Sequence, residues 1–252
     1  MLAAAGWLGC GDADHEREDR PASSATRPQV VAPRLSPRRW TALPASRLKR
    51  TEVSAAAVGE DIYVVGGFEA RTGRSTAAVE RYEPARRRWS RVRAMPRAVN
   101  HASTFSHAGE LYVLGGYVSV ADTSTKAVAS FWRYEPRRDR WSALPPAPSR
   151  RAAFGAAVIG DRLYVAGGRN DNHTSLNSLE TFDFRTRRWS RGPAMPTARE
   201  HVAAAALDGL FYVAGAAYSG RAPCRPSSVT DPNAIAGSGC PGFRPPARAS
   251  RS

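Results

Sequence analysis

The chain has 252 residues, of which 42% are hydrophobic, and its net charge is +15 at pH 7. It contains no apolar run long enough to cross a membrane as a helix. A basic chain of this kind suggests a nucleic-acid partner when the charge forms one patch. Here the arginines gather in short turns before tryptophans, as in Arg86–Arg88 and Arg137–Arg140. We therefore expect solvated hairpin turns and no nucleic-acid partner.

The first 30 residues have the pattern of an export segment followed by a tether. Leu2–Gly9 is apolar and Cys10 ends it, and a charged stretch containing Pro, Ser and Ala follows. This is similar to the lipid-attachment box of bacterial lipoproteins, although no basic residue precedes the apolar stretch. The resemblance implies an exported protein, periplasmic or at the cell surface, with Cys10 as lipidation site and membrane tether. A cytoplasmic location is the alternative.

From residue 31 one pattern recurs about every fifty residues. Its first landmark is a tryptophan, at Trp40, Trp89, Trp141 and Trp189. Its second is an apolar run that ends in small residues, at Ile62–Gly67, Leu111–Gly116, Leu163–Gly168 and Phe211–Ala216. Because both landmarks keep the same register, one supersecondary unit is used repeatedly.

The first full repeat predicts four short antiparallel strands with turns between them. They are expected at Ser54–Val58, at Ile62–Val65, at Ala78–Tyr82 and from Trp89 onward. A single sheet of this size cannot bury both faces, so like sheets must stack on it. We expect the recurring Tyr and Trp rings to fill the spaces between adjacent sheets.

These landmarks together resemble the kelch motif. They are the apolar-Tyr-Val-x-Gly-Gly run, a polar loop, the stretch Glu80–Pro84, then Trp89 and Met95-Pro96. Each such motif forms one blade of a β-propeller. The resemblance therefore implies an all-β kelch propeller over residues 31–216, with three complete blades and a split or partial fourth. Trp132 departs from the motif, because it replaces the glutamate found at Glu80 and Glu180.

The last repeat loses its Tyr…Trp half. A fourth blade can be assembled by joining an opening strand at Trp40 to closing strands at His201–Gly215. Residues 217–252 are rich in Pro, Gly, Ser and Arg, which predicts an irregular tail. Two explanations stay open: a real tail, or a frame-shifted reading of a gene that once encoded more blades. The break comes directly after a good strand, which favours truncation.

The three cysteines predict neither a metal site nor a redox cofactor. Cys10, Cys224 and Cys240 lie outside the blades, and their spacing matches no common zinc pattern. Copper chemistry of the galactose oxidase type needs a cysteine in a blade, which this chain lacks. We expect no cofactor, and an exported chain is expected to allow a disulfide between the two C-terminal cysteines.

A propeller places the loops that enter its innermost strands, and those that follow its second strands, on one face around the central channel. From this register we predict a ligand-binding mouth at Arg50, Glu52, His101, Arg151, Arg169, His173, Arg199 and His201. Arginines and histidines in one mouth suit a carboxylate or an acidic peptide. The alternative is that the arginines only tie the blades together.

The resemblance implies a binding module more than an enzyme. We expect a non-catalytic propeller that binds a protein or a carbohydrate through its blade loops. The alternative is a periplasmic sugar-active enzyme resembling a kelch-type sialic-acid mutarotase, with Arg199, Glu200 and His201 supplying acid and base. Fold alone does not decide between these functions.

Overall fold

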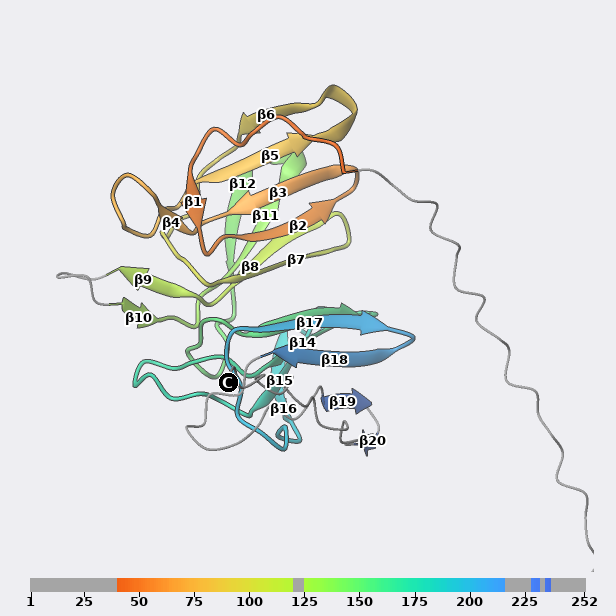
Figure 1. Ribbon diagram of the computed structural model, residues 1–252. Helices are drawn as coiled ribbons and strands as arrows, with labels where there is room; N and C mark the ends of the chain where they lie inside the picture. The colour runs from red at the N-terminus through yellow and green to blue at the C-terminus, as the bar shows by residue number, and fades with distance from the viewer. Residues whose placement is uncertain (1–39, 120–124, 216–227, 232–233, 237–252) are drawn as a thin grey trace, which may run out of the picture. The chain divides into compact units, whose positions relative to one another are not determined.

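The computed structural model describes residues 40–119, 125–215, 228–231 and 234–236 (Figure 1). The chain divides into two units, Met1–Ala42 and Leu43–Ser252, and all the described strands belong to the second. The described residues are all-β, which confirms the predicted fold class, and none of their helices could cross a membrane. Cys10, Cys224 and Cys240 lie outside the described residues, so lipidation and the disulfide stay predictions.

Four antiparallel four-stranded sheets carry the repeats, and we call them blades 1 to 4. Blade 1 consists of β2 (Ser54–Val58), β3 (Asp61–Val65), β5 (Val79–Glu83) and β6 (Arg88–Arg91). Blade 2 consists of β7 (Ser103–His107), β8 (Glu110–Leu114), β11 (Phe131–Glu135) and β12 (Arg140–Leu144). Blade 3 consists of β13 (Gly155–Ile159), β14 (Arg162–Ala166), β15 (Leu179–Asp183) and β16 (Arg188–Gly192). Blade 4 consists of β17 (Val202–Leu207), β18 (Leu210–Gly215), β19 (Ser228–Asp231) and β20 (Ala234–Ala236).

The remaining elements are short and lie between the blade strands. Two two-stranded pairs join β1 (Arg50–Thr51) to β4 (Phe68–Glu69), and β9 (Tyr117–Ser119) to β10 (Thr125–Ala127). Two 3-10 helices, η1 (Pro84–Arg86) and η2 (Pro136–Arg138), form the arginine-rich turns of blades 1 and 2. Proline fixes a helical φ at the start of each turn.

The innermost strands are β2, β7, β13 and β17, and each contacts the next in that order. Apolar side chains of neighbouring blades form a separate core cluster in each of the three spaces between them. Between blades 1 and 2, for example, the rings of Tyr63 and Tyr134 meet edge-on with centroids 5.9 Å apart. The predicted role of the large rings is therefore confirmed.

Each motif tryptophan also bonds to the preceding repeat. Its Nε1–H donates to the backbone carbonyl four residues after the previous tryptophan of the series. The three bonds are Trp89 to Pro44 at 2.8 Å, Trp141 to Arg93 at 2.9 Å, and Trp189 to Pro145 at 2.9 Å. The tryptophan thus links successive repeats as well as filling space.

The fourth blade forms differently from our expectation. Residues 40–49 form no strand and Trp40 is exposed, so the proposed sealing strand at Trp40 was wrong. The outer strands β19 and β20 come instead from the segment predicted to be irregular, and β19 pairs with β18 at Phe211–Val213. The physical reason is the free edge of β18, whose backbone N–H and C=O groups need partners.

The recurring glycine pairs allow a close approach of neighbouring repeats, which one substitution tests. Gly167 has φ +68°, and an added Cβ would lie 2.6 Å from the carbonyl oxygen of Arg199. Gly160 has a similar φ of +57° but no atom within 4 Å of the same position. We expect Gly160→Ala to cost about 1–2 kcal/mol of unfolding free energy and Gly167→Ala clearly more, measured by urea denaturation. Equal losses would contradict the close approach.

Candidate functional site

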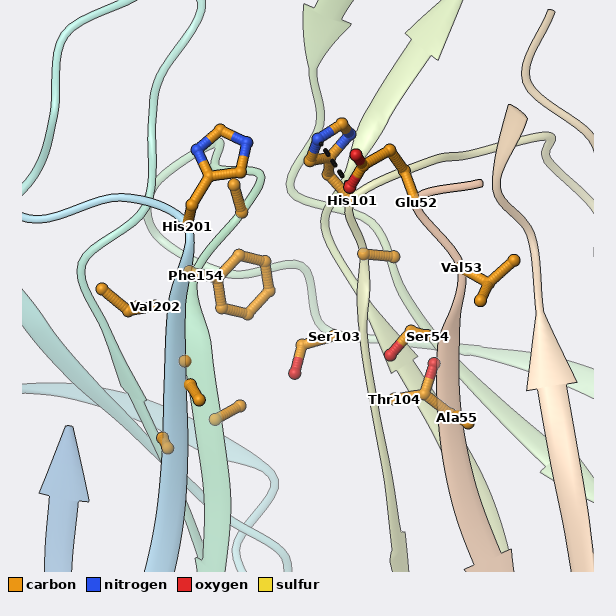
Figure 2. A pocket seen from close by; sticks show the side chains of 16 residues that line it. Glu52, Val53, Ser54, Ala55, His101, Ser103, Thr104, Phe154, His201 and Val202 are labelled. Atoms are coloured by element: carbon orange, nitrogen blue, oxygen red, sulfur yellow. Dashed lines mark ion pairs between the residues drawn. The ribbon is translucent and has the colours of Figure 1, made fainter. Parts of the chain in front are cut away.

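The innermost strands of all four blades begin at one cavity of about 490 Å³ (Figure 2). The first turn into each strand carries one of four equivalent residues, and these are Glu52, His101, Ala153 and His201. All four have left-handed backbones, with φ of 52°, 50°, 54° and 49°. This conformation is costly for a side chain other than glycine, so its recurrence marks a fixed feature of the repeat.

Backbone hydrogen bonds between blades support this rim. The N–H of His101 donates to the carbonyl of Glu52 at 3.2 Å, and the N–H of Ala153 donates to the carbonyl of His101 at 2.9 Å. The rim side chains of blades 1, 2 and 3 are therefore attached to a continuous backbone network. Such support holds binding groups in a fixed geometry.

A carboxylate and an imidazole meet on this rim. Oε2 of Glu52 lies 3.1 Å from Nε2 of His101, and Figure 2 shows the two side chains facing one another. The His101 side chain is 14% exposed, whereas that of Glu52 is 48% exposed. The pair therefore presents a partly solvated carboxylate over a largely buried ring.

Asn100 fixes the other side of the His101 ring. Its Nδ2 donates to the carbonyl of Tyr117 at 3.3 Å and to Oγ of Ser75 at 2.7 Å. The amide oxygen then faces Nδ1 of His101 at 2.6 Å. Because an amide oxygen only accepts, we assign the proton to Nδ1 of His101.

A second carboxylate–histidine pair lies opposite. Oε1 of the buried Glu200 is 3.7 Å from Nδ1 of His201, and the His101 and His201 rings meet edge-on at 5.1 Å. Nε of Arg169 lies 3.2 Å from Oε2 of Glu200 and balances its charge. Two histidines, each beside a carboxylate, thus meet at the cavity, and Glu200 is buried and does not line it.

The buried arginines do not lie in this cavity. Arg50 donates to the carbonyl of Gly66 and pairs with Glu80 at 2.8 Å, within blade 1. Arg151 does the same in blade 3, with Gly167 and with Glu180 at 3.0 Å.

Arg199, at the third such position, is 3% exposed and donates to the carbonyl of Gly215 at 2.8 Å. We placed all three in the mouth, but they lie inside the blades, which agrees with the alternative of a structural role. The guanidinium groups of Arg50 and Arg151 satisfy a backbone carbonyl and a buried carboxylate together, and that of Arg199 satisfies a backbone carbonyl.

The structure thus places only some of the predicted mouth residues at the cavity. Glu52, His101 and His201 line the cavity together. Arg169 does not line the cavity and forms an ion pair with Glu200. Its Nε also donates to the carbonyl of His173, which belongs to the same loop and does not line the cavity. Asn100 was missing from our predicted site, and we named Glu200 only for the alternative enzyme. Each immediately precedes a rim histidine, and the repeat register is the signal that would have found them.

Burial changes the titration of His101. The pKa of His101 lies below its ordinary value of 6.5, first because burial disfavours the charged ring and then because His201 lies close. The Glu52 and Glu200 carboxylates act in the opposite direction without reversing the shift. At neutral pH the ring is therefore the neutral base of the site.

This shift predicts a pH dependence of stability. A base with a lowered folded-state pKa binds fewer protons in the folded chain than in the unfolded chain. The contribution of His101 to folding stability is therefore present above pH 6.5 and is lost as the pH falls through its folded-state pKa. We expect the melting temperature to fall as the pH drops below 6.5, and to fall less in His101→Gln. Calorimetry over this window measures it, with His173→Gln as control. An identical pH profile in wild type and His101→Gln would exclude this contribution.

Among the described residues, no group of three or more His, Cys, Asp or Glu side chains is arranged to hold a metal ion. The rim carries hydrogen-bonding and acid–base groups. It offers carboxylate acceptors and imidazole nitrogens, and the cavity wall adds the hydroxyls of Ser103 and Thr104.

Comparison with known proteins agrees with this architecture. The solved structure of YjhT is similar with a TM-score of 0.61 and 20% identity, over 70% of this chain and 62% of that chain. The chain therefore spans less than two thirds of that structure, and the likeness concerns the fold. No curated protein matches the sequence significantly. Residues 34–215 match the Attractin/LZTR1 β-propeller, and the chain belongs to this family of kelch-type β-propellers.

Proposed function

We propose that the chain is a non-catalytic binding module whose cavity takes a carbohydrate. The observation that carries the proposal is the convergence of four blades on one cavity of about 490 Å³, lined by the Glu52–His101 pair and by His201. Small-molecule sites have volumes of roughly 300–1,000 Å³ and a few converging polar groups. The same loops would bind a protein ligand if a loop of that partner entered the cavity.

The charges of the site favour a neutral ligand. The arginines that suggested a carboxylate ligand are bound within the blades, and Arg169 is paired with Glu200. The cavity presents the Glu52 carboxylate and hydroxyl groups instead. Hydroxyl groups both donate and accept hydrogen bonds, so a neutral sugar satisfies this set without bringing a second negative charge to Glu52.

Saturation-transfer NMR with glucose, galactose and N-acetylglucosamine tests this proposal. We expect at least one sugar to bind the wild-type chain, and binding to weaken in Glu52→Gln and in His201→Gln. Arg185→Gln is the control, because Arg185 does not line the cavity. The proposal fails if none of the sugars binds, or if both rim variants bind as wild type does.

A sugar-active enzyme is the second candidate, of the kind that resembles a kelch-type sialic-acid mutarotase. The contact between Glu52 and His101 favours it, because a positioned carboxylate–imidazole pair can transfer protons. NMR exchange between the anomers of N-acetylneuraminate provides the test. A rate with wild-type protein no faster than the uncatalysed rate removes this candidate.

We also propose export with a lipid tether at Cys10. The apolar Leu2–Gly9 stretch and the polar segment after Cys10 support it. Metabolic labelling with a fatty acid in a bacterial host is expected to label the wild-type chain and not Cys10→Ser. Absence of label from both would refute the tether.

A further inference from the structure

The hydrogen-bonding partners of His101 bear on where its ring carries a proton. Both of its ring nitrogens face an oxygen atom, Nδ1 at 2.6 Å from Asn100 and Nε2 at 3.1 Å from Glu52. The first contact takes the Nδ1 proton, because the Asn100 amide is oriented by its donors to Tyr117 and Ser75.

The second contact then needs a proton of its own. A neutral ring with its proton on Nδ1 has a lone pair on Nε2, and that lone pair would face a carboxylate oxygen. Two acceptors at this distance repel, so the contact is favourable only while a proton lies between them, as a hydrogen bond from Nε2 to the carboxylate. The protonated ring and the carboxylate then have a net charge of zero as a pair.

We propose that Glu52 and His101 share one proton at the cavity rim and make ligand binding there proton-linked, with Asn100 as the positioning residue. This deepens the proposed function and rests on it for the identity of the cavity as the binding site. A neutral hydroxyl ligand binds best while the pair keeps its proton, since the charge of the Glu52 carboxylate is then balanced by the ring. Loss of the proton leaves Glu52 facing a bare nitrogen, and its half-exposed side chain turns toward solvent.

The other groups around His101 influence the pH range in which the pair holds this proton. His201 lies against the ring from blade 4, with Glu200 behind it and Arg169 paired to Glu200. The rings of Tyr117 and Phe68 cover the two remaining sides. Protonation of His201 therefore opposes protonation of His101, and the carboxylates of Glu52 and Glu200 favour it.

Nitrogen NMR of the imidazole rings in the ¹⁵N-labelled full chain tests the proposal without a ligand. We expect neutral His101 to carry its proton on Nδ1. We expect Glu52→Gln to lower the pKa of His101, because the amide removes a favourable charge, and Glu60→Gln, at an exposed turn, to leave it unchanged. Asn100→Ala is expected to release the ring to the Nε2 tautomer.

Two results would overturn the proposal: a neutral His101 with its proton on Nε2, or a titration that Glu52→Gln does not move. Asn100 is buried, so if Asn100→Ala does not fold, the half-exposed Glu52 variant still decides. Failure of this test leaves the sugar-binding result standing. Conversely, a chain that binds no sugar can still show the shared proton, so the two proposals fail separately.

Discussion

Arg151→Ala is expected to lower the unfolding free energy by about 3–5 kcal/mol, more than any surface change in the chain. The Arg151 and Glu180 side chains are both 0% exposed and lie 3.0 Å apart. Glu180 also accepts from Oγ of Ser149 at 2.5 Å. Removing the guanidinium leaves a buried carboxylate with its countercharge missing, and burial makes that charge costly. Urea denaturation followed by tryptophan fluorescence measures the loss.

The neighbouring Arg150 is the matched control. Its side chain is 65% exposed and reaches Asp171 at 3.2 Å, so Arg150→Ala should cost less than about 1 kcal/mol. The double change Arg151→Met with Glu180→Leu removes both charges, and we expect it to cost less than Arg151→Ala alone. Similar losses for Arg150→Ala and Arg151→Ala would show that the buried pair does not stabilise the blade.

The repeat and its strands could be predicted because their causes are local. The run Ile62–Val65 is β-branched and aromatic, and the glycines after it end the strand, so the pattern alone places β3 within one residue. The tail strands could not be predicted in this way. Ser228–Asp231 has no alternating pattern, and it becomes a strand because the edge of β18 offers partners.

The site could be predicted only in part, because side-chain direction depends on the backbone. Arg199 and His201 are two residues apart, yet one lies inside a blade and the other lines the cavity. The difference comes from the left-handed turn at position 201, with φ 49°. The residue types of Glu52, His101 and His201 do not predict a left-handed backbone, which glycine or asparagine adopts more readily. The arginine register was therefore correct, while the inferred direction of those side chains was not.

Blade 2 shows that the repeat can form a blade without the buried ion pair. At the positions of Arg151 and Glu180 it has Val99 and Trp132, so both partners of the pair are replaced together. Ser130 nevertheless keeps the hydroxyl that in blade 3, as Ser178, accepts from Arg151 at 3.1 Å. Oγ of Ser130 is buried and has no hydrogen-bond partner among the described residues. Blade 2 thus retains an acceptor for an arginine that it does not contain.

Restoring the pair in blade 2 is expected to show strong coupling between the two positions. Val99→Arg alone buries a guanidinium without its carboxylate, and Trp132→Glu alone buries a carboxylate without its guanidinium. Each single change is expected to cost about 3–5 kcal/mol. In the double variant the new arginine can reach the introduced carboxylate, the Ser130 hydroxyl and the carbonyl of Gly115, as Arg151 reaches their equivalents.

Urea denaturation of the two single variants and the double variant measures this coupling as a double-mutant cycle. We expect the loss of unfolding free energy in the double variant to be smaller than the sum of the two single losses, by about 0.5–3 kcal/mol. The uncharged pair Val99→Met and Trp132→Gln is the control and should be closer to additive, because it forms no ion pair. Additive losses in the charged cycle would mean that blade 2 has diverged in backbone as well as in side chains. The ion pair would then depend on each blade's own geometry, and the sequence register alone would not be enough to transplant it.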